Sequence, residues 1–121
     1  MKSILVVEDE PEINELIRDN LSDLGLKIDH ALNATEGFQL CVKKKYELIL
    51  SDVRMPKMTG REMFASIRRN ENPNQKTTFI FISAFLDEVK DLFDSETVFL
   101  IRKPIEFDYL KTLVKQLLKI P

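Results

Sequence analysis

Short apolar runs alternate with amphipathic stretches along this chain, and that alternation restricts the folds open to it. Five runs are candidates for strands: Ser3–Val7, Leu26–Ala31, Glu47–Ser51, Thr78–Ser83 and Thr97–Arg102. Strands that alternate with helical segments predict a parallel sheet covered by helices on both of its faces. We therefore expect a doubly wound α/β fold with a five-stranded parallel sheet, in which each strand is followed by a helix.

The patterns within the runs separate central strands from edge strands. Leu48–Leu50 and Phe79–Ile82 are apolar at every position, so both faces of these strands must be buried, as in the centre of a parallel sheet. Apolar and polar residues alternate in Leu26–Ala31, which is typical of a more exposed strand. The third and fourth runs are therefore expected at the centre of the sheet and the second at an edge.

Capping residues mark the ends of several expected helices. Pro11 suits the first turn of a helix, where its missing N–H would have no partner, and Gly25 suits the end of the same segment. Two pairs have the spacing of a capping box: Asn33 with Glu36, and Thr59 with Glu62.

Size and composition indicate one globular domain over residues 1–121. The 121 residues suffice for one hydrophobic core, and the net charge of -2 arises from 20 acidic and 18 basic side chains without a basic patch. We therefore expect no direct binding to nucleic acid or membranes. The single cysteine, Cys41, excludes an intramolecular disulfide. Because Ser3–Val7 is too short for a signal peptide or a membrane span, we expect a cytoplasmic protein.

Polar side chains that can carry chemistry follow four of the five candidate strands. They are Glu8 and Asp9 after the first, Asp52 after the third, Ser83 at the end of the fourth and Lys103 after the fifth. Ligands of open α/β sheets bind at the carboxyl ends of the strands. We therefore expect three carboxylates, a hydroxyl and an ammonium group to meet in one crevice.

This set of groups favours phosphoryl transfer. Three neighbouring carboxylates repel one another unless a cation neutralises them, and Mg2+ prefers such oxygen ligands and bridges carboxylates to phosphate. Lys103 would contact a phosphoryl oxygen, and Ser83 would donate its hydroxyl. Asp52 is the expected nucleophile, because a carboxylate between Lys103 and the metal can form an acyl phosphate.

Each of these residues also has an ordinary structural interpretation. Glu8 or Asp9 would serve as a cap for the helix that begins near Pro11, and Lys103 alone would be a surface lysine. Their joint position at four strand ends favours the functional interpretation.

The motifs around these residues resemble receiver domains of two-component response regulators over essentially the whole chain. The similar segments are Ile4–Glu10 with its acidic pair, Ser51–Gly60 around Asp52, Ser83-Ala84 and Lys103-Pro104. The resemblance implies a flavodoxin-like (βα)5 fold with strand order 2-1-3-4-5.

The resemblance also implies a metal site and a phosphorylation site that share carboxylates. Mg2+ would be held by Asp9, Asp52 and the backbone carbonyl of Arg54, with Glu8 acting through water. Asp52 would accept a phosphoryl group from the phosphohistidine of a histidine kinase or phosphotransfer protein. A downstream protein would then receive the signal.

Further expectations follow for the catalytic groups. Ser83 would move toward the phosphoryl group, Lys103 would hold one of its oxygens, and the Lys103–Pro104 bond is commonly cis in the family. Such a domain is not a conventional enzyme, because it catalyses its own phosphorylation and slow dephosphorylation. Arg54 and Phe85 would flank the phosphoryl group and slow its hydrolysis by excluding water. In the alternative, Arg54 would point into solvent and Phe85 would pack on the fourth helix.

Two features depart from the family pattern. Before the fifth strand, residues 94–97 (Asp-Ser-Glu-Thr) stand where the family typically has small or Gly-containing segments. Leu100 stands three residues before Lys103, where the family usually has Tyr or Phe. The neighbouring Phe99 would take over the role of that ring, or the aromatic part of the relay would be absent.

Other functions fit the motifs less well. A scaffold that binds partners without phosphorylation would not need Asp52, Lys103 and the acidic pair. An aspartyl-nucleophile phosphatase usually has an acid two residues after the nucleophile, where this chain has Arg54. A flavodoxin-type electron carrier would need a Gly-rich and Ser/Thr-rich phosphate loop after the first strand.

Overall fold

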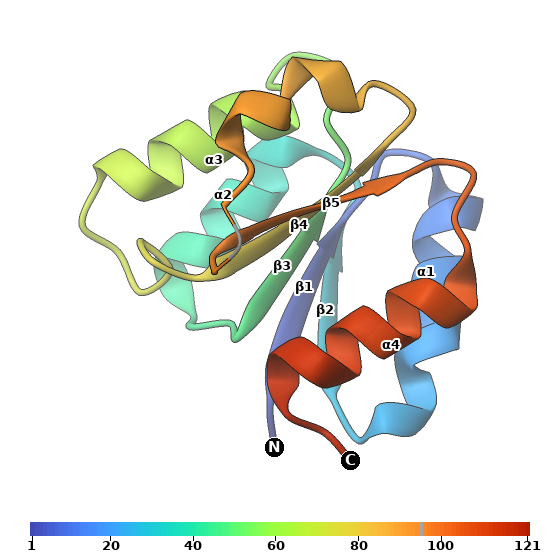
Figure 1. The fold of residues 1–121 in the computed structure, drawn as a ribbon. Helices are drawn as coiled ribbons and strands as arrows, with labels where there is room; N and C mark the ends of the chain where they lie inside the picture. The colour runs from blue at the N-terminus through green and yellow to red at the C-terminus, as the bar shows by residue number, and fades with distance from the viewer. Residues whose placement is uncertain (95) are drawn as a thin grey trace.

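The computed structural model describes residues 1–94 and 96–121, and it contains a five-stranded sheet with four α-helices in that part of the chain (Figure 1). The strands are β1 (Ser3–Val7), β2 (Lys27–Ala31), β3 (Leu48–Ser51), β4 (Thr78–Ser83) and β5 (Val98–Arg102). The helices are α1 (Pro11–Leu21), α2 (Ala34–Lys43), α3 (Gly60–Arg69) and α4 (Phe107–Leu118). The expected strands β2, β3 and β5 each begin one residue later than predicted.

The sheet is parallel throughout and has the order β2-β1-β3-β4-β5, so the predicted topology is confirmed. Helices α1 and α4 cover one face, while α2 and α3 cover the other (Figure 1). Because β1 lies between β2 and β3, the chain reverses its direction of winding there. The carboxyl ends of β1 and β3 therefore lie side by side at the switch point.

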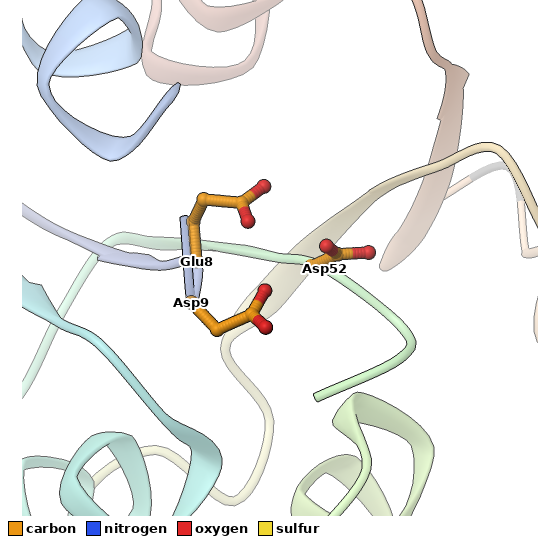
Figure 2. A group of neighbouring side chains, drawn as sticks. All are labelled: Glu8, Asp9 and Asp52. Atoms are coloured by element: carbon orange, nitrogen blue, oxygen red, sulfur yellow. The ribbon is translucent and has the colours of Figure 1, made fainter. Parts of the chain in front are cut away.

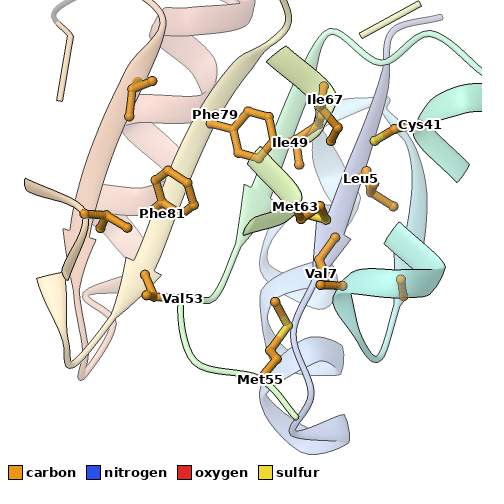
Figure 3. Packing of buried hydrophobic residues seen from close by; sticks show 14 of the residues in the cluster. Leu5, Val7, Cys41, Ile49, Val53, Met55, Met63, Ile67, Phe79 and Phe81 are labelled. Atoms are coloured by element: carbon orange, nitrogen blue, oxygen red, sulfur yellow. The ribbon is translucent and has the colours of Figure 1, made fainter. Parts of the chain in front are cut away.

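Two hydrophobic clusters explain why the central strands are apolar at consecutive positions. Alternate residues of each strand face opposite sides of the sheet. In β3, Ile49 packs with α2 and α3, whereas Leu48 and Leu50 pack with α1 and α4. Figure 3 shows the first cluster, in which Phe79 and Phe81 of β4 lie near β3. Burial on both faces fixes the strand positions and thus the positions of the residues that follow them.

The predicted capping signals are present in the structure. Pro11 is in the first turn of α1, and Gly25 has a positive φ of 71° after the short 3-10 turn Ser22–Leu24. The Thr59 side chain and Glu62 form a reciprocal capping box at α3. At α2, the Asn33 side chain accepts a hydrogen bond from the backbone N–H of Glu36.

The predicted helix between β4 and β5 is wrong. This connection contains two 3-10 segments, Leu86–Glu88 and Lys90–Leu92. Leu86 and Val89 are both buried and lie three residues apart, a spacing that fits a 3-10 turn as well as an amphipathic helix. Among its described residues, the fourth of the expected βα repeats has no α-helix.

Cys41 is buried in the core, where it packs as a small apolar residue. Among the described residues, no helix combines the length and apolar character needed to cross a membrane.

Candidate functional site

The three predicted carboxylates meet at the carboxyl ends of β1 and β3. Glu8 and Asp9 project from the end of β1 toward Asp52, which follows β3 (Figure 2). Each side chain offers one oxygen, and these oxygens lie within 4.8 Å of one another. Glu8 and Asp52 are buried, and Asp9 is half-buried. The neighbouring strands thus bring together residues that are far apart in the sequence.

Lys103 brings a positive charge to this carboxylate cluster. Its Nζ atom lies 2.7 Å from Glu8 Oε1 and 3.0 Å from Asp52 Oδ2. The backbone N–H of Lys103 donates to the carbonyl oxygen of Ser83, which fixes the start of its side chain beside β4. One ammonium group balances three carboxylates only in part. The cluster therefore keeps two uncompensated negative charges when all its groups are ionised.

Ser83 lies at the same end of the sheet and is completely buried. Its Oγ atom accepts a hydrogen bond of 2.9 Å from the backbone N–H of Phe85. A pocket of about 190 Å3 opens beside it, lined by Asp9, Glu10, Asp52, Arg54, Ser83, Ala84, Phe85 and Lys103. The predicted crevice therefore exists and contains two of the three predicted carboxylates, Asp9 and Asp52, with the hydroxyl and the ammonium group, while Glu8 pairs with Lys103 behind it.

Backbone contacts hold Asp52 in its place. Its N–H donates to the Val7 carbonyl oxygen, and its Oδ1 atom accepts from the N–H of Val53 at 2.6 Å. The loop then turns back so closely that a Cβ atom on Gly60 would lie 2.0 Å from the Asp52 carbonyl oxygen. Glycine is required at the start of α3 because any larger residue would displace the Asp52 backbone.

The Arg54 side chain makes two contacts that the sequence did not reveal. Its guanidinium carbon lies 3.6 Å from the centre of the Phe85 ring, and its Nε atom lies 2.8 Å from Glu88 Oε1. Arg54 and Phe85 thus form a stacked pair at one side of the pocket. Glu88 could not be found from sequence because its position depends on the 3-10 segments after β4.

The structure corrects one alternative for the missing aromatic residue. Leu100 packs on the face of the sheet that carries α2 and α3, whereas Phe99 packs on the face with α1 and α4. Phe99 instead makes an edge-to-face contact with Phe93, with ring centres 6.5 Å apart. Neighbouring residues of a strand point to opposite faces, so Phe99 does not take the place of the usual ring.

A second residue near the site was also missed. Asn14 of α1 is fully buried, and its side-chain amide donates to the carbonyl oxygens of Glu8 and Ala31. A polar residue on the apolar face of a predicted helix is a signal that could have revealed Asn14.

The bond between Lys103 and Pro104 is cis, as the family resemblance implied.

A family model for the response regulator receiver domain matches residues 4–115. The chain belongs to this family. Among curated relatives, the probable transcriptional regulator ycf29 of Porphyra purpurea is 31% identical over 119 residues, covering 96% of this chain and 56% of that protein. This receiver domain spans about half the length of the curated relatives it matches.

Solved structures agree with this assignment. TrrA of Thermotoga maritima, determined in complex with Mg2+–BeF, is 33% identical with a TM-score of 0.81, and the match covers 97% of this chain and 99% of that chain. The chemotaxis response regulator CheY4 of Vibrio cholerae is 24% identical with a TM-score of 0.82, covering 97% and 98% of the two chains. The second similarity supports the fold alone.

Burial changes the ionisation of the receiver domain's carboxylate cluster. Loss of water around Glu8 raises its pKa to about 7, although hydrogen bonds from Lys103 and the Glu10 N–H oppose this rise. Burial disfavours the charged form of Lys103, but the hydrogen bonds to Glu8 and Asp52 outweigh that effect and raise its pKa. The charge of the Glu8 carboxyl group, whose pKa is about 7, therefore depends on pH near neutrality.

This raised pKa predicts that the metal-free domain is less stable at higher pH. The folded state holds a proton on Glu8 that the unfolded state releases, so the Glu8 contribution is present below about pH 4.5 and is lost as pH rises through about 7. The free energy of unfolding should fall by about 3 kcal/mol across this range. Urea denaturation at a series of pH values, with a chelator present to keep the domain free of metal, measures this free energy of unfolding.

The control for this prediction is Glu8→Gln, which keeps the side-chain size and cannot titrate. The difference in unfolding free energy between wild type and the variant should depend on pH between about 5 and about 8. A constant difference across that range would mean that the pKa of Glu8 is not raised in the folded domain.

Proposed function

We propose that this domain is a signalling switch that accepts a phosphoryl group on Asp52 in the presence of Mg2+. The observation that carries the proposal is the position of the Asp52 carboxylate between Lys103 and the acidic pair, beside a pocket of about 190 Å3. Phosphoryl transfer depends mainly on positioning and on neutralisation of charge, and these groups supply both.

The carboxylate cluster fits Mg2+ in its chemistry and in its charge. Carboxylate oxygens are the ligands that this ion prefers, and its two positive charges equal the uncompensated charge of the fully ionised cluster. Asp9, Asp52 and the backbone carbonyl of Arg54 would hold the ion, and Glu8 would act through water. When bound, Mg2+ neutralises phosphoryl oxygens. The Mg2+–BeF complex of the related TrrA domain supports this assignment.

The reaction assigns one task to each residue of the site. An Asp52 carboxylate oxygen attacks the phosphorus of a phosphohistidine, the P–N bond breaks, and its electron pair stays with the imidazole. Lys103 exchanges its contact with Asp52 for one with a phosphoryl oxygen. The Ser83 hydroxyl gives up its hydrogen bond from the Phe85 N–H and donates a hydrogen bond to the phosphoryl group. Each movement breaks a contact that holds the unphosphorylated site together.

The partners would be a histidine kinase or a phosphotransfer protein and a downstream protein target, in the cytoplasm. A groove of about 450 Å3, lined by Ile13, Leu16, Ala84, Lys103, Pro104, Ile105 and Phe107, shares Ala84 and Lys103 with the pocket beside Asp52. Its apolar lining and its position suit a protein that delivers a phosphoryl group to Asp52. The net charge of -2 does not favour direct binding to nucleic acid.

A phosphatase function receives no support from the residue two positions after Asp52. Arg54 stands there and pairs with Glu88, so it supplies no acid to protonate a leaving group. A scaffold that works without phosphorylation would gain no mass on incubation with acetyl phosphate and Mg2+.

Phosphorylation should depend on Asp52. Incubation with acetyl phosphate and Mg2+ should increase the intact mass by about 80 Da, the mass of one phosphoryl group. Asp52→Asn should abolish the increase because an amide cannot form the acyl phosphate. Asp87→Asn, at an exposed position outside the pocket, should be phosphorylated like wild type. Equal phosphorylation of Asp52→Asn, or none of wild type, would contradict the proposal.

The Arg54–Phe85 stack should lengthen the lifetime of the phosphorylated state. Both side chains line the pocket beside Asp52, and bulk there hinders a water molecule from approaching in line with the phosphorus–oxygen bond. Arg54→Ala and Phe85→Ala should each shorten the half-life of the phosphorylated domain several-fold, measured by loss of the added mass after removal of donor.

Arg61→Ala is the matched control for the stack. Arg61 pairs with Asp91 on the same 3-10 connection, but it does not line the pocket beside Asp52. The half-life of the phosphorylated Arg61→Ala domain should equal that of the phosphorylated wild-type domain. If all three variants decay at the wild-type rate, the stack does not shield the phosphoryl group.

A further inference from the structure

Asn14 occupies an unusual position for an amide side chain. It lies on the buried face of α1 with Ile17 and Leu21, and none of its surface is exposed. Its Nδ2 atom donates to the Glu8 carbonyl oxygen at 3.1 Å and to the Ala31 carbonyl oxygen at 3.0 Å. Its Oδ1 atom accepts from Arg18 Nε at 2.8 Å. Both N–H groups of the Asn14 amide therefore donate to backbone carbonyls at the carboxyl ends of β1 and β2.

These two contacts fix the turn that carries the acidic pair. β1 ends at Val7 and α1 begins at Pro11, so Glu8 and Asp9 lie in a short connection between them. Asn14 reaches back from α1 and joins the Glu8 carbonyl to the carboxyl end of β2. The same Ala31 carbonyl also accepts the Glu8 N–H at 3.2 Å. The peptide between Glu8 and Asp9 is therefore anchored at its carbonyl oxygen.

The anchor matters most for Asp9. The Glu8 carboxylate is held by Lys103 and by the Glu10 N–H. Within the part of the chain that the structure describes, the Asp9 carboxylate has neither a hydrogen bond nor an ion pair with another residue. Its direction toward Asp52 depends on the backbone, and the backbone before it is held by Asn14.

We propose that Asn14 is a positioning residue for the metal site, whose amide holds the Glu8–Asp9 peptide so that both carboxylates point at Asp52. A residue that orients a ligand typically changes metal affinity about 10-fold to 100-fold when it is removed. This inference rests on the proposed Mg2+ site and adds a residue that does not touch the ion.

The chain offers a matched control in Asn74. This asparagine is also fully buried, and its Nδ2 atom also donates to two backbone carbonyls, those of Cys41 and Lys44. It lies before β4 at the opposite end of the sheet, where its Oδ1 atom accepts from the Tyr46 N–H. Removing either amide should destabilise the fold, but only Asn14 lies beside the acidic pair.

The experiment compares Asn14→Leu with Asn74→Leu by calorimetric titration with Mg2+ alone. Asn14→Leu should raise the dissociation constant about 10-fold, whereas Asn74→Leu should leave it within about twofold of wild type. With acetyl phosphate as donor, Asn14→Leu should be slow at low Mg2+ and should approach the wild-type rate at saturating Mg2+. A merely structural role would lower stability in both variants without this separation.

Two further measurements guard against misfolding of the leucine variant. Asn14→Ser keeps one hydroxyl donor and should raise the dissociation constant less than Asn14→Leu. In the wild-type domain, the Asn14 side-chain amide signals in NMR spectra should shift on Mg2+ addition while those of Asn74 stay in place.

Three results would overturn the inference. Folded Asn14 variants could bind Mg2+ as tightly as wild type, Asn74→Leu could weaken Mg2+ binding as much as Asn14→Leu, or the Asn14 side-chain amide signals could stay in place when Mg2+ is added. If wild type itself does not bind Mg2+, the proposed function fails. If wild type binds and the Asn14 variants bind equally well, only the role of Asn14 fails.

Discussion

The contacts of Lys103 with Glu8 and Asp52 are the interaction on which the site depends. Buried carboxylates are costly unless a partner neutralises them, and removal of one partner of such a pair is strongly destabilising. Lys103 follows β5, at the edge of the sheet, and reaches carboxylates that follow β1 and β3. One ammonium group therefore joins three strand ends into a single site, but it leaves a negative charge that favours a divalent cation.

The rest of the fold holds these charges at the required positions. Hydrophobic clusters on both faces fix the central strands, so the residues after β1 and β3 have little freedom. The close approach of Gly60 to the Asp52 carbonyl, and the proposed anchoring of the Glu8–Asp9 peptide by Asn14, hold the loops. By contrast, the 3-10 connection after Ser83 contacts the site through exposed pairs such as Arg54–Glu88, which makes it the part best suited to move.

The sequence predicted the sheet and the composition of the site because both follow from strand order. A parallel sheet brings the residues after its strands to one edge, so Glu8, Asp52 and Lys103 could be placed together without a structure. The 3-10 segments were missed because Leu86 and Val89 fit an amphipathic helix as well as a tighter turn. The Arg54–Glu88 pair depends on that turn, and the contacts of Asn14 depend on a tertiary approach that periodicity does not encode.

The proposed function requires that Lys103 and the acidic pair are arranged to receive a phosphoryl group on Asp52. A crystal structure of the domain with Mg2+ and beryllofluoride tests it most directly, because beryllofluoride imitates a phosphoryl group on a carboxylate. We expect beryllium on an Asp52 oxygen, Mg2+ bound by Asp9 and Asp52, and Lys103 Nζ moved from Asp52 to a fluoride. Beryllofluoride on another residue, or a Lys103 that keeps both of its present contacts beside a modified Asp52, would contradict it.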